Sequence, residues 1–500
     1  MLIAMKLKKH VMKKPLLLLI SFSLLLFISC NNDDDGQIEN PNPNPPVATD
    51  FPVQNFMWQA MNLWYFWQAE VPNLADDRFA SNTEYAEFLG ATPDPGDFFA
   101  SIQFNEDRFS FSNSDYTTLV NNLNGVSKSN GLEFGLVRFG SADDVFGYVR
   151  YIIPNSDAAT KDIQRGDIFT RVNGTQITGA NFADLLFGDD DTYTLGLAVI
   201  NGNTIEDTTE EVTLTKFEGL TENPILVSTT FDVGGTTVAY LMYNGFTRDF
   251  DDELNDAFGG FVAAGATELV LDFRYNPGGS VNSSRLLSSM IYGTNTNDLY
   301  IRQRWNAKIQ NQLSSEQLED YFASTVNGAT LNSLNLSKVY IIATNSSASA
   351  SELVMNGLEP YVDVIHIGET TRGKNEFSIT MVDDSQNNFI YNRDREGNIN
   401  PENSWAIQPL VGRNENADGF FDYTDGLTPD IVLEEDLTNL GVLGDVSEPL
   451  LARALQEISS TSTKMDFNVQ MPARVMMDSK MFTPTKDNMW LDKPLNLELQ

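Results

Sequence analysis

A serine-rich segment, TNSSASASELVMNG at residues 344–357, follows an apolar strand-like run and leads into a predicted helix. Ser349 and Glu352 have the spacing of a capping box, in which a hydroxyl and a carboxylate bind the free amides of the first helical turn. A hydroxyl at this place can also be a nucleophile, because the free amides and the helix dipole stabilise a developing oxyanion. Spacing alone favours the cap, so the choice depends on the other reactive side chains.

Few other side chains could take part in such chemistry. The 500 residues include one cysteine, Cys30, and two histidines, His10 and His366. This composition excludes an internal disulfide framework and a cysteine-based zinc site, and it argues against a histidine-rich metal site, so no cofactor is expected. A Ser–His–Asp hydrolase would need His366 as its base. That residue lies in an apolar strand-like run and is interpreted as a core histidine.

A lysine motif offers the serine a different partner. GETTRGK, residues 368–374, ends at Lys374, beyond one predicted helix and one predicted strand from Ser349. Together with SASE at 349–352, this motif resembles the signature of the S41 serine peptidases, the C-terminal processing or tail-specific proteases. The resemblance covers roughly residues 50–455. Further matching motifs follow the family order: Asp107–Ser110, LDFRYNPGG at 271–279, and Gly426, Pro429 and Asp430.

The resemblance implies an α/β peptidase core of the ClpP/crotonase type within a multi-domain α+β chain. It also implies that Ser349 is the nucleophile and Lys374 the general base, while the backbone amides of Gly279 and Ala350 form the oxyanion hole. A lysine can act as a base only when it is neutral, so its pKa must fall from about 10.4 through burial.

Two positions depart from the family pattern. Ser378 stands where many members have a glutamine that orients the lysine, and Pro360 stands where some have an aspartate. The orienting group is left open between Ser378 and Glu352, and Glu352 is counted with the catalytic residues. The missing glutamine also supports an alternative in which the chain keeps the fold but has lost turnover.

The N-terminus resembles a bacterial lipoprotein signal. Five lysines precede an apolar run, Pro15–Ser29, that is too short to span a bilayer comfortably and is followed directly by Cys30. Residues 1–30 are therefore predicted to be a lipoprotein signal peptide, with Cys30 acylated as the mature N-terminus. An ordinary cleaved signal with an incidental cysteine is the alternative. The Asp-, Pro- and Asn-rich residues 31–48 are predicted to form an extended tether.

Composition divides the rest of the chain. Residues 49–125 are predicted to be a helical N-terminal domain, whose tryptophans are interpreted as core rather than as a ligand platform. Residues 223–460 alternate strand, helix and strand, which predicts an α/β core with parallel strands and is assigned to the peptidase. Residues 461–500 form a tail with little periodicity and no assigned role.

Between these parts, residues 126–222 alternate short strand-like runs with turns and predict a β-rich module. Its stretch RGDIFTRVNG at 165–174 resembles a PDZ domain, a family in which an extended peptide adds as a strand beside a loop that holds its carboxylate. The corresponding peptide-binding residues are Leu132, Glu133, Phe134 and Gly135. The alternative is a β-rich spacer that binds nothing.

These observations predict a serine endopeptidase of the cell envelope, an outer-membrane lipoprotein facing the periplasm or the cell surface. Its partners would be unfolded or C-terminally recognised polypeptides and, through the lipid anchor, the membrane. The formal charge of −37 argues against nucleic acid as a partner. The alternatives are an inactive peptide-binding lipoprotein of the same fold and a capture lipoprotein with an aromatic site in the N-terminal domain. The oligomeric state is not indicated.

Overall fold

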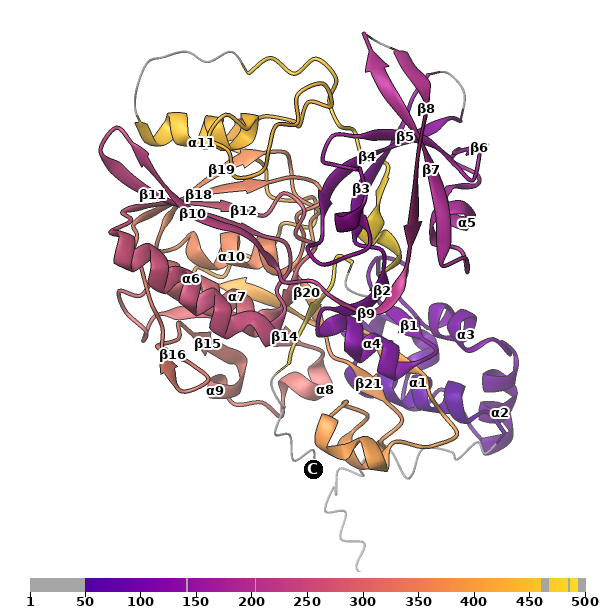
Figure 1. The fold of residues 1–500 in the computed structure, drawn as a ribbon. Helices are drawn as coiled ribbons and strands as arrows, with labels where there is room; N and C mark the ends of the chain where they lie inside the picture. Colours follow the sequence, from indigo (N-terminus) through magenta and orange to yellow (C-terminus); the bar gives the residue numbers. More distant parts are fainter. Residues whose placement is uncertain (1–49, 141–142, 203, 460–466, 484–485, 493–500) are drawn as a thin grey trace, which may run out of the picture. The chain divides into compact units, whose positions relative to one another are not determined.

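The computed structural model describes residues 50–140, 143–202, 204–459, 467–483 and 486–492 (Figure 1). Cys30 and the tether expected at residues 31–48 lie outside this part of the chain. Within the described ranges, no helix combines the length and the apolar character needed to cross a lipid bilayer.

The N-terminal segment is helical. Helix α1 (Pro52–Trp64) begins with a proline, whose fixed φ suits the first helical position. Trp58 and Trp64 are buried, and their indole N–H groups donate to the carbonyls of Asn73 and Asn388 at 2.8 Å. These tryptophans therefore pack in the core, which removes the main support for an aromatic capture site. The remaining elements here are α2 (Asn82–Gly90), α3 (Pro95–Ser101), β1 (Phe111–Asn113) and α4 (Tyr116–Leu123).

A strand-rich module follows, as expected, with a main sheet in the order β25-β3-β4-β5-β7-β8 and β6 paired to β5. The β5–β6 connection is an Asn173-Gly174 turn, where both residues have positive φ (49° and 75°), as a type I′ hairpin needs. Residues 158–160 form a single 3-10 turn, which ends because Lys161 is extended and Ile163 is buried in the core. The elements are β2 (Val126–Ser129), β3 (Leu132–Arg138), β4 (Val145–Ile152), β5 (Ile168–Val172), β6 (Thr175–Gln176), α5 (Phe182–Phe187), β7 (Thr192–Asn201), β8 (Thr204–Thr215), β9 (Phe217–Thr221) and β25 (Met477–Asp478).

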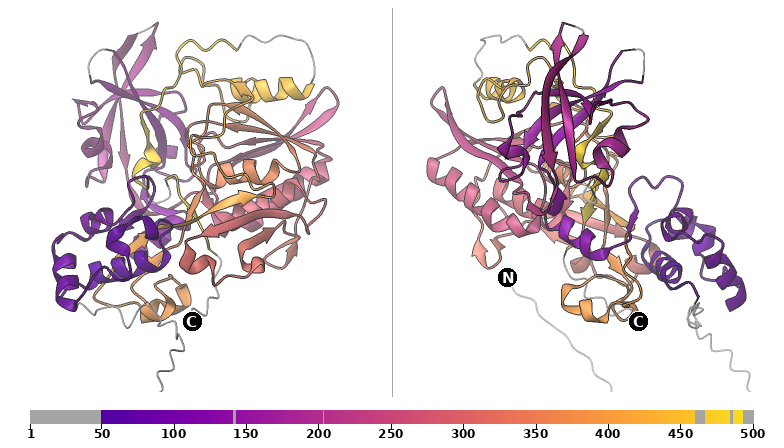
Figure 2. Two further views of the ribbon diagram at one scale, coloured as in Figure 1. Left: turned by 180° about the vertical axis from the view of Figure 1, so that it is seen from behind. Right: turned by 45° about the vertical axis from the view of Figure 1, so that its right-hand side comes forward.

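The predicted α/β core is confirmed as a six-stranded sheet in the order β10-β11-β12-β18-β19-β24, parallel except for β10. Side chains of β11 alternate between its faces: Leu241 packs with helices α6, α7 and α10, whereas Tyr240 packs with α11. Figure 1 and Figure 2 show these helices on the two sides of the sheet. The strands are β10 (Ile225–Val233), β11 (Thr236–Tyr243), β12 (Glu268–Asp272), β18 (Lys338–Ala343), β19 (Asp363–Gly368) and β24 (Ile431–Val432). The helices are α6 (Asp251–Ala264), α7 (Val281–Ile291), α10 (Ala350–Leu358) and α11 (Pro449–Ser459).

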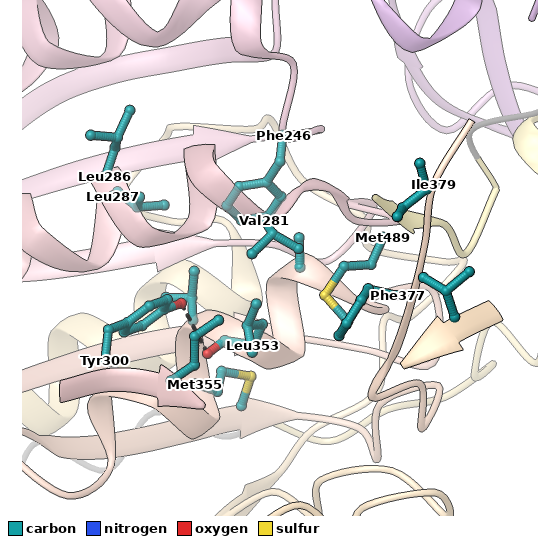
Figure 3. Packing of buried hydrophobic residues seen from close by; sticks show 14 of the residues in the cluster. Phe246, Val281, Leu286, Leu287, Tyr300, Leu353, Met355, Phe377, Ile379 and Met489 are labelled. Carbon is teal, nitrogen blue, oxygen red and sulfur yellow. Dashed lines mark hydrogen bonds between the residues drawn. The ribbon is translucent and has the colours of Figure 1, made fainter. Parts of the chain in front are cut away.

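A second, mixed sheet in the order β13-β26-β20-β23-β14-β15 was not anticipated. Its strands are β13 (Gly279–Ser280), β14 (Leu299–Trp305), β15 (Glu319–Tyr321), β20 (Glu376–Ser378), β23 (Leu410–Asn416) and β26 (Met489–Trp490). A hydrophobic cluster joins it to helices α7 and α10: Val281 and Leu353 from the helices meet Phe377 and Met489 from the sheet (Figure 3). The remaining elements are α8 (Ala307–Gln310), α9 (Ser315–Leu318), β16 (Thr325–Val326), β17 (Ala329–Thr330), β21 (Met381–Val382) and β22 (Ala406–Gln408).

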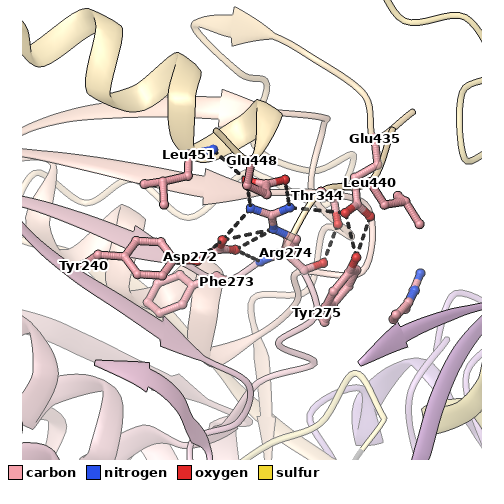
Figure 4. A network of polar contacts seen from close by, with 12 residues as sticks. Tyr240, Asp272, Phe273, Arg274, Tyr275, Thr344, Glu435, Leu440, Glu448 and Leu451 are labelled. Atoms are coloured by element: carbon pink, nitrogen blue, oxygen red, sulfur yellow. Dashed lines mark hydrogen bonds and ion pairs between the residues drawn. The ribbon is translucent and has the colours of Figure 1, made fainter. Parts of the chain in front are cut away.

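A buried ion network lies at the carboxyl end of β12 (Figure 4). Arg274 is fully buried and pairs with Asp272 at 2.6 Å, Glu448 at 2.6 Å and Glu435 at 3.2 Å. Burial alone would raise the pKa of Glu435, but Arg165 and Arg274 outweigh it and lower that pKa to about 2. The network fixes the chain at the point where it enters the NPGG turn of residues 276–279.

Candidate active site

Ser349 lies between β18 and α10, at the helix N-terminus. Its φ of 64° and ψ of −111° are unusual for a residue other than glycine, and strain of this kind concentrates at functional sites. The preceding turn is held by Ser347, whose Oγ donates to the Phe273 carbonyl at 2.7 Å. Ser349 is fully buried, and its Oγ has no hydrogen-bond partner of regular geometry within the described residues. A strained backbone thus presents a buried hydroxyl that makes no regular hydrogen bond within the described residues.

Lys374 lies in the loop after β19, and its side chain is fully buried. Burial lowers the pKa of Lys374 from its ordinary value to about 8, even though Glu376 and other nearby carboxylates raise it. The ring of Phe109, from the motif at residues 107–110, lies 4.9 Å from Nζ. A large fraction of this amine is neutral near pH 8, which is the state a general base requires.

One carboxylate joins the nucleophile segment to the lysine loop. Glu352 Oε2 accepts hydrogen bonds from the backbone amides of Ser349 at 2.7 Å and Lys374 at 2.9 Å. Its Oε1 accepts from the Thr371 hydroxyl at 2.5 Å and from the Gly373 amide at 2.7 Å. Burial raises the pKa of Glu352 to about 7, and these four hydrogen bonds oppose that rise.

The contacts of Glu352 combine the predicted helix cap with a link to the lysine loop. Ser349 and Glu352 do have the predicted capping-box arrangement at the start of α10. The same carboxylate extends past the helix and holds backbone amides of the lysine loop. Because its four hydrogen bonds go to amides and to the Thr371 hydroxyl, Glu352 positions Ser349 and Lys374 through their backbones.

The NPGG turn lies directly against the serine. Asn276 Oδ1 accepts from the Gly278 amide at 2.9 Å, and the Asn276 carbonyl accepts from the Ala348 amide at 3.1 Å. Gly278 has a φ of 110°, and a Cβ on it would stand 2.6 Å from Ser349 Cβ. Only glycine allows this close approach.

The two backbone amides predicted to form an oxyanion hole belong to Gly279 and Ala350. The Gly278 carbonyl and the Ser280 amide both bond to Phe246, so the amide of Gly279 between them points to the opposite side of the strand. Ala350 is the first residue of α10, and an amide at that position has no intrahelical acceptor. Such donors stabilise negative charge on a substrate carbonyl oxygen.

Ser378 reaches the lysine through a residue that the sequence did not indicate. Its Oγ donates to Asn488 Oδ1 at 3.0 Å, and Lys374 Nζ donates to the same atom at 3.2 Å. Gln408 Oε1, 2.5 Å from Ser378 Oγ, competes with Asn488 for the single proton of that hydroxyl. Asn488 belongs to the tail, whose weak periodicity gave no signal from which this contact could have been found.

The four predicted peptide-binding residues lie at the start of β3, where each is buried. Gly135 pairs with Asp478 of β25, so the edge of β3 that faces away from β4 is covered by the tail. The Phe134 amide donates to Ser479 Oγ at 3.0 Å, and Ser479 Oγ donates to Glu133 Oε2 at 2.5 Å. Leu132 packs in the core of the module.

His366 is a core residue, in agreement with its interpretation from the sequence. It lies in β19 and is 3 % exposed, and its Nε2 is 3.3 Å from the Ala343 carbonyl. Burial lowers the pKa of His366, so the ring is neutral. The described contacts of its ring involve neither Ser349 nor Lys374.

Comparisons with known proteins agree with this geometry. The profile of peptidase family S41 matches residues 237–432, and that of the peptidase S41 N-terminal domain matches residues 52–111. A crystal structure from Bacteroides fragilis, assigned by its name to the S41 proteases, is 25% identical with a TM-score of 0.62, covering 83% of this chain and 99% of its own. The photosystem II D1 C-terminal processing protease is 20% identical with a TM-score of 0.48, covering 83% and 99%. No protein with curated function matches the chain.

Proposed function

Because this chain belongs to peptidase family S41 and is a serine-type peptidase, we propose that Ser349 is its nucleophile and Lys374 its general base. The observation that carries the proposal is the pair of hydrogen bonds accepted by Glu352 Oε2, from the amides of both residues. A single oxygen atom within 2.9 Å of both amide nitrogens supports one buried site shared by the serine and the lysine.

The residues support a two-step acyl transfer. Neutral Lys374 takes the proton of Ser349 Oγ as that oxygen attacks the carbonyl carbon of the substrate. The amides of Gly279 and Ala350 hold the developing oxyanion, and Lys374 then gives its proton to the leaving amine. Water, deprotonated by the same amine, attacks the acyl-enzyme, releases the new carboxyl terminus and restores the serine.

The burial of Lys374 is what makes this chemistry available near neutral pH. A pKa lowered from the ordinary lysine value to about 8 leaves about one amine in ten neutral at pH 7. The strained backbone of Ser349 supports the same assignment, because such strain is retained where it presents a reactive group.

We further propose that the substrates are unfolded or C-terminally recognised polypeptides and that residues 126–222 deliver them as a PDZ-like module. The edge of β3 supports this role, because a strand that pairs there gains backbone hydrogen bonds independent of its side chains. Action in the cell envelope rests on the lipoprotein-like signal and Cys30. Radiolabelled palmitate should label the wild-type chain and not Cys30→Ser, and equal labelling would contradict the anchor.

Two substitutions test the catalytic pair. Ser349→Ala and Lys374→Ala should each abolish cleavage of an unstructured protein such as casein, while circular dichroism and thermal unfolding stay close to wild type. Exposed Ser447→Ala and half-buried Lys338→Ala serve as matched controls and should retain full activity. Activity retained by either catalytic variant would contradict the proposed role of that residue.

The alternative, a peptide-binding chain without turnover, is favoured by one feature. The lysine-orienting glutamine of the family is replaced by Ser378, whose hydroxyl reaches Lys374 only through Asn488. That alternative would be established if the wild-type chain and the tail variants Lys480→Glu and Asn488→Ala all cleave no peptide between pH 7 and 9.5 and show no Ser349 adduct with a fluorophosphonate.

A further inference from the structure

The C-terminal tail crosses the molecule along the route expected of a substrate. Described residues 467–483 and 486–492 contain two short strands, β25 and β26, which pair in two different sheets. Strand β25 pairs with β3 of the strand-rich module. Strand β26 lies between β13, which begins at Gly279 of the NPGG turn, and β20, which follows the loop of Lys374. The tail thus touches the proposed delivery edge and the proposed catalytic site in succession.

At the delivery edge the tail pairs as an added strand. Met477 and Asp478 run antiparallel to Leu136 and Gly135, and the Met476 amide donates to the Leu136 carbonyl at 2.8 Å. The next residue of the tail, Ser479, accepts a hydrogen bond from the Phe134 amide of β3 at 3.0 Å. Strand addition at a sheet edge is a general mode of peptide recognition.

Buried charges hold this part of the tail. Asp478 pairs with Arg150 at 3.3 Å, and the pKa of Asp478 is about 2 because Lys486 and Arg150 outweigh the effect of burial. Lys480 pairs with Glu222 at 3.2 Å. These pairs join the tail to the strand-rich module and to Glu222 beyond β9, and their side chains are mostly removed from solvent.

At the catalytic site the tail lies across the nucleophile. Met489 pairs in parallel with Gly279, on the side of β13 to which the Gly279 amide points. The Asn488 carbonyl oxygen and Ser349 Cβ both lie within 2.8 Å of the point where a Cβ on Gly278 would stand. The side chain of Met489 fills the hydrophobic cluster next to Phe377 (Figure 3). A substrate could not enter this space while the tail occupies it.

The tail also engages the base. Lys374 Nζ donates to Asn488 Oδ1 at 3.2 Å, whereas Ser349 Oγ has no partner among the described residues. Asp487 adds an ion pair with Arg372 of the lysine loop at 3.1 Å. The amine that should deprotonate the serine is directed at the tail, so the bond between residues 488 and 489 lies near the nucleophile without an activated hydroxyl.

We propose that residues 476–483 and 486–491 belong to an intramolecular inhibitory segment that fills both peptide-binding edges of this chain and must be displaced before a substrate is cut. This inference rests on the proposed function. It assigns the path of the polypeptide substrate, which would run along the edge of β3 that faces away from β4 and then between β13 and β20. The segment binds as an uncleaved substrate mimic, because Asn488 withdraws the lysine amine from Ser349.

A binding experiment tests the occupancy independently of catalysis. The full-length chain carrying Ser349→Ala and Lys480→Glu, with its fold checked by circular dichroism, is titrated into a fluorescent peptide of residues 471–492, and the anisotropy is measured. Saturable binding is expected, weakened at least tenfold by Met489→Asp in the peptide. Absence of saturation, or equal binding of a scrambled peptide, would overturn the proposal whether or not the wild-type chain is a peptidase.

An activity experiment on the full-length chain tests the inhibition without truncation. Lys480→Glu places a carboxylate beside Glu222 and should raise kcat/KM for a short fluorogenic peptide at least tenfold. The double variant Glu222→Lys/Lys480→Glu restores the opposite charges and should return kcat/KM to within about threefold of wild type. Unchanged or reduced activity in a folded Lys480→Glu chain would overturn the inhibitory role. If no variant cleaves any peptide while the tail peptide still binds, the proposed function has failed and the occupancy stands.

Mass spectrometry of the purified wild-type chain completes the test. The inference expects the bond between Asn488 and Met489 to stay intact over hours at pH 8, while Asn488→Ala frees the Lys374 amine and increases Ser349 labelling by a fluorophosphonate severalfold. A wild-type chain that already ends at Asn488 would overturn the assignment of the segment as an uncleaved inhibitor.

Discussion

The peptidase activity should rise with pH as Lys374 loses its proton. With a pKa of about 8, about one tenth of the amine is neutral at pH 7, half at pH 8 and about nine tenths at pH 9. If the neutral amine is the base, kcat/KM should increase about tenfold between pH 7 and pH 9, about fivefold from pH 7 to pH 8 and about twofold from pH 8 to pH 9.

The charge that opposes the lowered pKa of Lys374 leads to a second prediction. The shift from 10.5 to about 8 corresponds to about 3 kcal/mol of destabilised ammonium, and burial is its largest cause. Glu376 opposes that shift more than any other charge. Glu376→Gln keeps the shape of the side chain and removes the charge, so the midpoint of the pH profile should move to lower pH and the activity at pH 7 should increase.

The assay is the initial rate of hydrolysis of a fluorogenic peptide between pH 6.5 and pH 9.5, below KM, with folding checked by circular dichroism at each pH. Exposed Glu316→Gln is the matched control and should leave the midpoint unchanged. A wild-type profile that is flat over this range, or a midpoint that moves upward in Glu376→Gln, would refute the assignment of Lys374 as the base.

Four other changes have clear expected outcomes. Gly278→Ala should reduce kcat/KM at least a hundredfold, because its Cβ would stand 2.6 Å from Ser349 Cβ. Gly260→Ala, on the open face of α6, should stabilise the chain by up to about 1 kcal/mol in urea unfolding. Arg274→Leu leaves buried Asp272 and Glu448 without the arginine they pair with, while Glu435 keeps Arg165. It should lower the free energy of unfolding by about 3–5 kcal/mol, a loss that unchanged denaturation midpoints would contradict. Because the folded-state pKa of Glu435 is about 2, below its value in the unfolded chain, its contribution is complete above about pH 5 and lost as the pH falls towards 2; Glu435→Gln should flatten the acid dependence of urea unfolding.

The elements of the central sheet could be predicted from the sequence because their signals are local. TTVAYLMY at residues 236–243 is apolar throughout, as expected for a strand buried on both faces, and it forms β11. The helix after Phe250 and the strand at 268–272 were equally marked by their periodicity. The pairing of Ser349 with Lys374 came from motif resemblance, and in the structure the backbone amides of both residues donate to Glu352.

The elements that escaped prediction depend on distant partners. Strands β25 and β26 are two residues long, so they have no periodicity and exist only through the edges they pair with. Asn488 could not be recognised for the same reason. The sequence indicated the helix cap of Glu352, because a capping box is a local pattern. It did not indicate the bonds of Glu352 to the Lys374 loop, because a helix and a strand separate the two in the sequence.

The bonds of Glu352 have a consequence for the biogenesis of the enzyme. The serine turn and the lysine loop share one carboxylate, so neither reaches its final geometry until the strand between them has joined the sheet. Hydrolytic competence therefore arrives together with the tertiary structure and not before it. With the catalytic pair proposed above, a partly folded chain therefore cannot hydrolyse another chain of the same protein before its own fold is complete.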